Sequence, residues 1–251
     1  MAAVEKLKPN DDEVWRTRVD LAAGIQISAM LGMTEGIDNH FTVKVPGQEN
    51  QFFVNPKGLH WSEVRASDIL ICEADGTVIE GDLPPPVSAI CIHLPIHQAH
   101  PRGNVVFHTH MPYSTALACS KEGRLEMCHQ NSVRFWNDVA YDDDFHGLAD
   151  DASEGRRMAE VFGDKSVMFL ANHGAITATS TIAESLDYMY FLERACEVQI
   201  LAESRGKGLH IIPEDVIKMT FEQYGNFTIN SARHFEALKR MLEREGSDYA
   251  E

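Results

Sequence analysis

Apolar residues recur at helical spacing in several segments of the chain. Over residues 15–30 they lie three or four positions apart and the run stops at Gly32, which predicts a helix whose N-cap is Asn10. A T-x-x-E capping box at residues 181–184 predicts a long helix that continues to about residue 204. Further helices are predicted over residues 88–100, 112–120, 152–162, 214–224 and 229–244.

Strand-like alternation marks several segments between these helices. "FTVKV" alternates apolar and polar residues, the chain turns at Pro46–Gly47, and "QFFV" leads back, which predicts a β-hairpin. "DILICEADGTVI" predicts a second hairpin that turns at Asp75–Gly76. Single strands are expected at residues 104–107, 166–170 and 175–179, whereas the Asp-rich segment 121–150 is expected to be an irregular surface excursion near a site.

The predicted elements favour one mixed α/β domain over residues 1–251. No internal repeat and no Gly/Ser-rich linker divides the sequence, and the number of hairpins predicts a largely antiparallel sheet. No G-x-G-x-x-G motif follows a predicted strand, and the Walker phosphate loop is missing. These absences argue against a doubly wound dinucleotide-binding fold and against a P-loop nucleotide site.

Charge and cysteine usage restrict the partners and the compartment. The formal net charge is −16 and no basic block occurs, so nucleic acid and anionic membrane surfaces are poor partners, although a local pocket can still bind a small anion. The five cysteines are scattered, which favours reduced thiols inside the cell. The charged start "MAAVEKLKPNDDEVW" does not fit a signal peptide, and no apolar run reaches the ~20 residues of a membrane span. A cytoplasmic protein is expected.

Three histidines stand where a metal site could form. His108 and His110 lie two residues apart at the end of an apolar strand, so their side chains share one face if the strand continues through them. His173 follows another buried strand and precedes a glycine that would let the backbone turn sharply. Three imidazoles are a sufficient protein ligand set for a divalent ion. Spacing alone also allows ordinary surface or hydrogen-bonded core histidines.

A second histidine pair competes for the ligand role. His93 and His97 are four residues apart on the predicted helix 88–100, but the glutamate of an H-E-x-x-H motif is missing and Pro95 lies between them. The more ordinary interpretation is a packed helix face beneath the strand histidines. His93 and His97 therefore remain candidates for supporting or catalytic roles.

Several stretches together resemble the class II aldolase/adducin family. They are "DNHFTVKVPG", "FVNPKGLHWSEVRASDIL", "HLPIHQAHPRGNVVFHTH" and "FLANHGAIT", in the family order, and the similarity runs from about residue 14 to residue 245. The resemblance implies a three-layer α-β-α domain with a mostly antiparallel central sheet, usually assembled as a homotetramer. It places the metal ligands at His108, His110 and His173. Zinc is the usual ion, with manganese, iron and cobalt as alternatives, and it would act as a Lewis acid that stabilises an enolate.

The chain departs from the family pattern at the residues for catalysis and phosphate binding. Ala89 stands where family aldolases carry a glutamate that serves as metal ligand and base, and Ser88 is the one serine left of a pair. The phosphate-binding turns read "NHFT" and "NPKG", which place His40 and Lys57 where smaller residues are usual. We expect Asn39, His40, Lys57 and Ser88 to bind substrate, with His40 and Lys57 as point cations suited to a carboxylate rather than a phosphate.

The resemblance and these departures predict a metal-dependent carbon–carbon lyase. The expected reaction is decarboxylation, or aldol cleavage, of a small non-phosphorylated oxo, hydroxy or aromatic carboxylic acid, with His93, His97 and Tyr113 as candidate proton donors. Tyr113 could equally be a packing residue, and Lys57 a solvated turn lysine. One alternative is a non-catalytic, adducin-like protein-binding module. Another is a sugar-phosphate epimerase, which the altered phosphate contacts disfavour. Tyr249 lies in a short acidic tail that is expected to fray.

Overall fold

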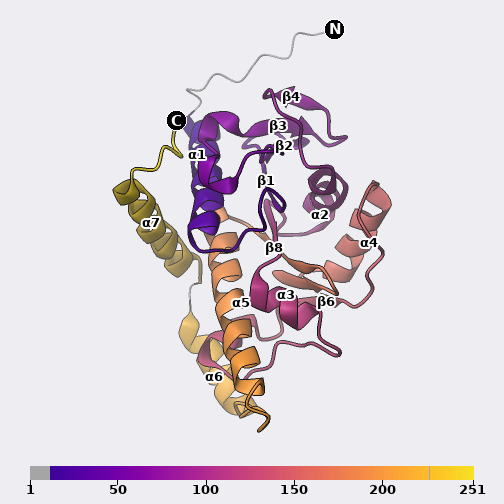
Figure 1. Cartoon of the computed structure of the whole chain (residues 1–251), viewed down its shortest axis with the longest axis vertical. Coiled ribbons are helices and arrows are strands. Elements are labelled where there is room, and N and C mark those ends of the chain that lie inside the picture. Colours follow the sequence, from indigo (N-terminus) through magenta and orange to yellow (C-terminus); the bar gives the residue numbers. More distant parts are fainter. Residues whose placement is uncertain (1–11, 226) are drawn as a thin grey trace.

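The computed structural model describes residues 12–225 and 227–251 (Figure 1). Its α-helices agree with the predicted segments to within a few residues, although the Asn10 N-cap lies outside the described residues. Thr181 does cap the long helix, because its side chain accepts a hydrogen bond from the Glu184 amide. The α-helices are α1 (Asp12–Met30), α2 (Leu94–Ala99), α3 (Pro112–Ala118), α4 (Ala152–Phe162), α5 (Ile182–Glu203), α6 (Glu214–Tyr224) and α7 (Phe227–Glu245).

Eight strands form one sheet in the order β4-β3-β2-β1-β5-β8-β7-β6. Six of the seven neighbouring pairs are antiparallel, and only β6 and β7 run parallel, so the predicted antiparallel character is confirmed. The strands are β1 (His40–Lys44), β2 (Gln51–Val54), β3 (Leu70–Glu73), β4 (Val78–Glu80), β5 (Val105–Thr109), β6 (Val139–Asp142), β7 (Val167–Leu170) and β8 (Gly174–Thr179).

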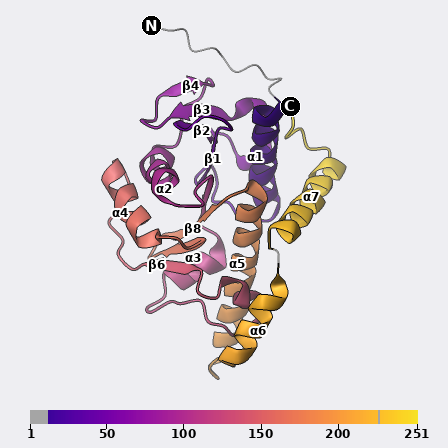
Figure 2. The same ribbon diagram turned by 180° about the vertical axis from the view of Figure 1, so that it is seen from behind.

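Side-chain alternation sends each strand's residues to two different helical layers. On one face Phe41 of β1 and Phe107 of β5 are paired across the strands, and their rings stack with centroids 3.6 Å apart in the core beneath α1 and α5. The neighbouring residues His40 and His108 are also paired, and they face the opposite layer, which holds α2 and α4. Figures 1 and 2 show α1, α5 and α7 on one side of the sheet and α2 and α4 on the other. The three-layer α-β-α architecture is therefore confirmed.

The predicted helix 88–100 is interrupted. Residues Ala89–His93 form a π-helical turn and α2 continues from Leu94 to Ala99. Pro95 has no N–H to donate to the carbonyl four residues earlier, so a regular α-helix cannot run through this point. Helix α4 packs closely against the altered turn, because a Cβ on Gly155 would lie 2.0 Å from the Cys91 carbonyl oxygen.

The segment 121–150 is more ordered than predicted. It contains the 3₁₀ helix η4 (Gln130–Phe135) and the edge strand β6. The strand has only four residues, and its last one, Asp142, is a charged residue that is buried through two hydrogen bonds from Arg157, at 2.8 and 2.5 Å. Strand β6 was not predicted because a short strand that ends in a paired aspartate lacks the usual apolar pattern.

The expectation of a frayed C-terminus is wrong. The Tyr249 side chain is buried, and the carbonyl oxygens of Tyr249 and Glu251 accept hydrogen bonds from the backbone of Ala66 and Ser67, each at 2.9 Å. The last residues therefore dock on the segment between β2 and β3. No helix among the described residues combines the length and the apolar character that crossing a bilayer requires.

Candidate metal centre

His108, His110 and His173 converge at one end of the central strands. His108 lies in β5, His110 follows the end of that strand, and His173 lies in the tight connection between β7 and β8. The ring centroids of the three histidines are 4.7 to 4.8 Å apart, and one potential ligand atom from each lies within 4.8 Å of the others. Long-range strand pairing thus brings together the three residues that the sequence analysis selected.

Hydrogen bonds orient two of these rings with Nε2 toward the common centre. His108 donates from Nδ1 to the Ala175 carbonyl at 3.0 Å, and His110 donates from Nδ1 to the Glu35 carboxylate. In the neutral form each ring then has an unprotonated Nε2, and the two Nε2 atoms lie 2.9 Å apart. Second partners of this type fix the tautomer and orientation of metal-binding histidines.

The electrostatics favour the neutral form of His108 and His173. Burial, followed by the neighbouring histidines, holds the pKa of His108 well below its usual range. Burial also lowers the pKa of His173 to about 4. A neutral imidazole carries the lone pair that a metal ion needs, and three such ligands leave a position open for a substrate. The donor set fits a divalent cation.

The loop that carries His173 is shaped by two neighbouring residues. Asn172 has φ of 56°, in the left-handed region, so the asparagine makes the sharp turn that had been assigned to the glycine. Gly174 is required for space instead, because a Cβ there would lie 2.6 Å from the Thr109 carbonyl oxygen and 2.9 Å from His110 Cδ2. The absence of a side chain at residue 174 lets His173 approach the strand histidines.

Asn39 is a strained polar residue beside the histidines. Its φ of 78° is uncommon for an asparagine, and its Oδ1 accepts a hydrogen bond from the His110 amide at 3.4 Å. Asn39 Nδ2 is buried and has no hydrogen-bond partner in the part of the chain that the structure describes. The orphaned amide hydrogens are available to an acceptor on a bound molecule.

A pocket of about 920 Å³ opens over the three histidines. Asn39, His40, Lys57 and Ser88, the residues expected to bind substrate, all line it. Its wall also includes large apolar side chains that are unusually exposed, namely Ile37, Val87, Phe145 and Leu148, of which Leu148 is 92% exposed. The cavity therefore combines a polar floor with an apolar rim.

His93 and His97 lie beneath the pocket rather than in its wall. His93 Nε2 is 2.9 Å from His40 Nδ1, and Thr42 Oγ1 lies 2.8 Å from His93 Nδ1 and 2.7 Å from His97 Nε2. Among the described residues, the hydrogen bonds of His93 and His97 connect with the pocket wall through His40. Burial is the main cause that lowers the pKa of His97 to about 3 and the pKa of His93 well below its usual range.

The expectation that His40 is a point cation is wrong. Burial first, and then the nearby His93, His173 and His110, hold its pKa well below the usual value. A divalent ion next to the ring would lower the pKa further, by charge repulsion. His40 therefore acts toward a ligand as a neutral ring, which leaves Lys57 as the cationic side chain in the pocket wall.

Tyr113 and Ala89 face the core. The Tyr113 amide donates to Glu193 Oε1 at 2.8 Å, its ring packs against the core beneath α1 and α5, and it is not part of the pocket wall. Ala89 is fully buried in an apolar cluster with Phe52, Leu70 and Leu94. A carboxylate at residue 89 would therefore enter an apolar environment in this chain.

Two further residues, Glu35 and Thr42, support the site and were not predicted from the sequence. Glu35 contacts His110 although it lies in an irregular loop, and Thr42 connects His93 with His97 from within a strand. Glu35 carried no recognisable signal. The polar Thr42 stands between the apolar Phe41 and Val43, and it faces the same side of the strand as His40. That alternation was the available clue.

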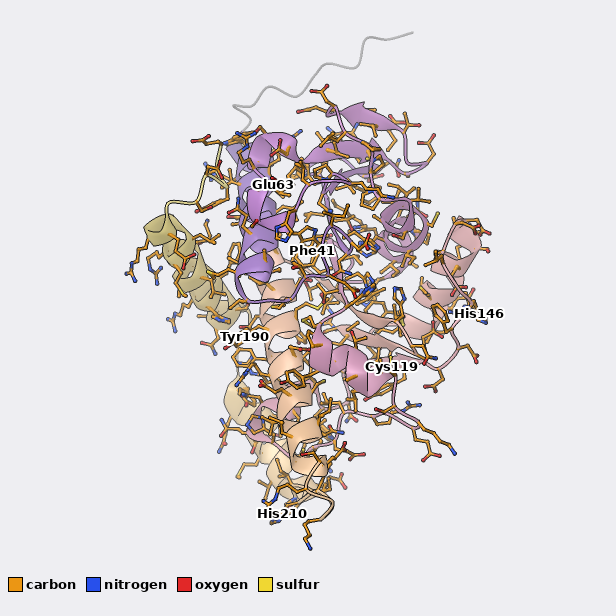
Figure 3. All side chains as sticks on the ribbon, viewed as in Figure 1. Phe41, Glu63, Cys119, His146, Tyr190 and His210 are labelled. Atoms are coloured by element: carbon orange, nitrogen blue, oxygen red, sulfur yellow. The ribbon has the colours of Figure 1, made fainter. Side chains whose placement is uncertain are left out.

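Figure 3 shows the side chains of the described residues and labels Phe41, His146 and His210 among others. Phe41, on the face of the sheet opposite His40 and His108, lies near the centre of the view, whereas His146 lies at the edge next to α4. His210 is at the far end of the molecule, beyond the long helix α5. Neither of these two peripheral histidines is part of the pocket wall.

Comparisons with known proteins place this chain in a family. The chain is 32% identical over 242 residues to a putative aldolase class 2 protein of Caulobacter vibrioides, which covers 94% of this chain and 93% of that one. It is 29% identical to the decarboxylase NovR of Streptomyces niveus, over 82% and 76% of the two chains, and 26% identical to human beta-adducin, over 91% of this chain and 34% of that one.

Solved structures agree with these sequence relationships. An aldolase II superfamily protein from Pseudomonas syringae superposes with a TM-score of 0.89 at 36% identity, over 98% of both chains. L-fuculose 1-phosphate aldolase from Glaciozyma antarctica gives 0.83 at 27% identity, over 94% and 92% of the chains. The sequence model of the class II aldolase and adducin N-terminal domain matches residues 19–200. The chain therefore belongs to the class II aldolase and adducin family.

Proposed function

We propose that the protein is a divalent-metal-dependent carbon–carbon lyase for a small, non-phosphorylated carboxylic acid. The observation that carries the proposal is the convergence of His108, His110 and His173 on one centre, with the Nδ1 atoms of the first two already used as donors. Such a ligand set leaves the full positive charge of the ion for a substrate, because no ligand is anionic.

The three histidines would hold zinc, with manganese, iron or cobalt as alternatives, since imidazole accepts all of these ions. A bound ion supplies Lewis-acid chemistry that withdraws electrons from a breaking carbon–carbon bond. The chain itself orients the ligands through Glu35 and the Ala175 carbonyl, and burial favours the neutral form of His108 and His173.

The pocket favours a carboxylate over a phosphate. Lys57 is its cationic side chain, and the Asn39 amide and the Ser88 hydroxyl are the neutral donors on the same wall. A phosphate dianion is usually held by several backbone N–H groups and more than one cation. One lysine with two neutral donors suits a single carboxylate, which the open ligand position of the ion can share.

The rim favours a substrate with an apolar or aromatic body. Phe145 and Leu148 project beside the pocket although both are large and exposed. Exposed apolar groups at a cavity mouth gain free energy when a ligand covers them. A relative named as a decarboxylase, at 29% identity, supports decarboxylation as the first reaction to test, with aldol cleavage as the other.

The candidate proton donors lie outside the pocket wall. In the described part of the chain, His93 and His97 can exchange protons with the pocket along the hydrogen bonds that end at His40. Tyr113 would need a conformational change, or a place in a neighbouring subunit's pocket, to act. His93, His97 and Tyr113 are the candidate donors, and donation from the two histidines requires the hydrogen bonds between Thr42 and His40 to reverse their direction.

We also propose that the protein is a cytoplasmic homotetramer, as is usual in the family. All five cysteines are free, which fits a reducing compartment. The exposed Ile37, Val87 and Phe145 would be covered if a neighbouring subunit closes the pocket mouth. Light scattering on the purified protein measures the assembly directly.

Metal loading and product analysis together test the proposed function. The purified protein is reconstituted with zinc, manganese, iron or cobalt and incubated with aromatic and aliphatic oxo and hydroxy acids, and carbon dioxide and carbonyl products are quantified. We expect turnover that a chelator abolishes and that His173→Ala lacks. Turnover of L-fuculose 1-phosphate with none of the carboxylic acids would overturn the choice of substrate class.

The alternative is a non-catalytic, adducin-like binding module. Ala89 favours it, because the glutamate expected of a family aldolase is replaced and its position is buried. The similarity to human beta-adducin covers 91% of this chain. Failure to bind any divalent ion, combined with stable capture of a cytoskeletal protein by the intact chain, would support this alternative.

A further inference from the structure

We infer that His40 is held with an unprotonated Nε2 facing the pocket, and that it selects substrates that carry a hydroxyl group next to the metal-binding carboxylate. The inference rests on the proposed function for the presence of a bound acid, but the tautomer of His40 follows from the hydrogen bonds within the protein. It narrows the substrate class to acids with a hydroxyl group at the carbon next to the carboxylate, and the carbonyl group that accepts the electrons of the breaking carbon–carbon bond then lies at another carbon of the substrate.

A buried series of hydrogen bonds runs from Gly103 through His97, Thr42 and His93 to His40. His97 Nδ1 lies 2.6 Å from the Gly103 carbonyl oxygen, which can only accept, so Nδ1 carries the proton. His97 is fully buried and neutral, and its Nε2 is therefore an acceptor. The tautomer of His97 is set by the backbone.

Thr42 passes this polarity on to the next ring. Its hydroxyl lies 2.7 Å from His97 Nε2 and 3.3 Å from the Val106 carbonyl oxygen. If the proton pointed to Val106, two lone pairs would face each other across 2.7 Å, so the hydroxyl donates to His97. Thr42 Oγ1 has only one proton and must accept from His93 Nδ1, at 2.8 Å.

The tautomer of His93 in turn determines that of His40. With its proton on Nδ1, His93 has an unprotonated Nε2, and it accepts from His40 Nδ1 at 2.9 Å. His40 Nε2 is then a bare lone pair, without a hydrogen-bond partner in the part of the chain that the structure describes. The His40 ring lines the pocket, and its centroid lies 4.9 Å from that of His108.

The complementary groups on the pocket wall define what His40 recognises. The adjacent Asn39 offers an unpaired amide donor and Lys57 an ammonium group, both suited to carboxylate oxygens. His40 Nε2 instead needs a donor, which a hydroxyl group has and a ketone lacks. A 2-oxo acid would place its carbonyl lone pair against that of the His40 ring. A 2-hydroxy acid can donate from its hydroxyl group to His40 and accept with its carboxylate from Asn39 and Lys57.

The first experiment reads the tautomer by nitrogen NMR on zinc-loaded protein with ¹⁵N-labelled histidine at pH 7.5. We expect His40 to show a protonated Nδ1 and an unprotonated Nε2. Thr42→Val removes the hydroxyl that relays the polarity and should leave His40 as a mixture of tautomers, while Thr42→Ser should retain the wild-type pattern. If Thr42→Val does not fold, the wild-type spectrum decides.

A proton on His40 Nε2, or direct coordination of that nitrogen by zinc, would overturn the inference. This readout does not depend on turnover. If the expected tautomer is observed but the proposed lyase activity is not, the tautomer assignment of His40 holds and the proposed function fails. If the activity is normal but the other tautomer is observed, only the inference about His40 fails.

The second experiment measures recognition with mandelate and phenylacetate, which differ by one hydroxyl group, by titration calorimetry on the zinc-loaded protein. Chelation of zinc favours mandelate in any variant, so the comparison is the change in preference. His40→Phe should lower the mandelate-to-phenylacetate affinity ratio by about tenfold, as expected for losing one acceptor to a buried hydroxyl. An unchanged ratio, with the zinc content intact, would overturn the assignment of hydroxy acids.

Discussion

The Nε2 atoms of His108 and His110 lie 2.9 Å apart, while the Nδ1 atom of each ring already donates to another group. Two lone pairs at this distance repel unless a proton or a metal ion lies between them. Because His108 is buried and its pKa is lowered, a proton is poorly held there. The arrangement is therefore organised for a cation, which His173 would complete.

The first prediction concerns metal content. His173→Ala should reduce bound zinc from about one ion per chain to a small fraction, because two imidazoles hold the ion much more weakly than three. Elemental analysis after reconstitution and dialysis measures this, with His146→Ala as a control, since that side chain is half exposed and outside the pocket. A wild-type content below ~0.2 ions per chain after reconstitution would contradict the metal hypothesis.

Gly174→Ala should damage the metal centre through sterics alone. The new Cβ would lie 2.6 Å from the Thr109 carbonyl oxygen, and both are backbone-anchored, so the strand end must shift. We expect unfolding free energy to fall by about 1–3 kcal/mol, with weaker metal binding as His173 moves.

Gly24→Ala is the matched control for this substitution. Gly24 lies in α1, and a Cβ there would be 3.5 Å from the Ile182 side chain, which is an ordinary van der Waals distance. Alanine is also a better helix former than glycine. Urea unfolding and zinc titration compare the two variants. Equal stability and zinc affinity of Gly174→Ala and the wild type would show that the loop has more room than the structure indicates.

The third prediction tests whether the family glutamate can be restored. Ala89 is fully buried among Phe52, Leu70 and Leu94, so Ala89→Glu would place a carboxylate in an apolar cluster without a partner. We expect a loss of about 3 kcal/mol or more in unfolding free energy and no gain of sugar-phosphate aldolase activity. Thermal unfolding and activity assays measure both, and Ala89→Ser, which adds only a hydroxyl, should be far milder.

A stable Ala89→Glu variant with new aldolase activity would mean that the π-helical turn can rotate residue 89 toward the pocket. In that event the lost glutamate, rather than the altered phosphate contacts at His40 and Lys57, would be what separates this chain from the sugar-phosphate aldolases.

Most of the fold was accessible from the sequence because long helices and paired hairpins carry their own periodic signals. The H-x-H spacing indicated that His108 and His110 share a face, and a strand pattern placed His173 at the end of β7. The family resemblance then made the convergence of the three residues a specific prediction. Local periodicity alone left it open, because strand order is a long-range property.

The parts that were not predicted depend on contacts between distant segments. Strand β6 is stabilised by pairing with β7 and by the Arg157–Asp142 ion pair, neither of which affects local propensity. The neutral state of His40 depends on burial by residues more than fifty positions away, such as His93. A sequence motif specifies residue types, whereas the protonation state is determined by the assembled environment.

The last prediction is a loss of stability in mild acid, caused by histidines that are buried in the neutral form. The pKa of His97 is lowered from 6.5 to about 3 in the folded protein, mainly by burial, and burial also lowers the pKa of His100. Below pH 6.5 the unfolded chain takes up protons that the folded chain does not, so the free energy of unfolding decreases as the pH falls and is unaffected above about 7.5. Each such histidine contributes up to about 1.4 kcal/mol per pH unit.

Urea unfolding of the metal-free protein between pH 7.5 and 5.5 measures this slope before most carboxylates titrate. His97→Gln cannot take up the proton, so we expect a shallower pH dependence even though the variant starts less stable through its altered bond to Gly103. The difference in slope between the two proteins isolates one histidine, because the other buried rings are common to both. Identical slopes would mean that His97 takes up its proton in the folded protein over the same pH range as in the unfolded chain, and below that range the polarity that it imposes on Thr42 and His93 would reverse.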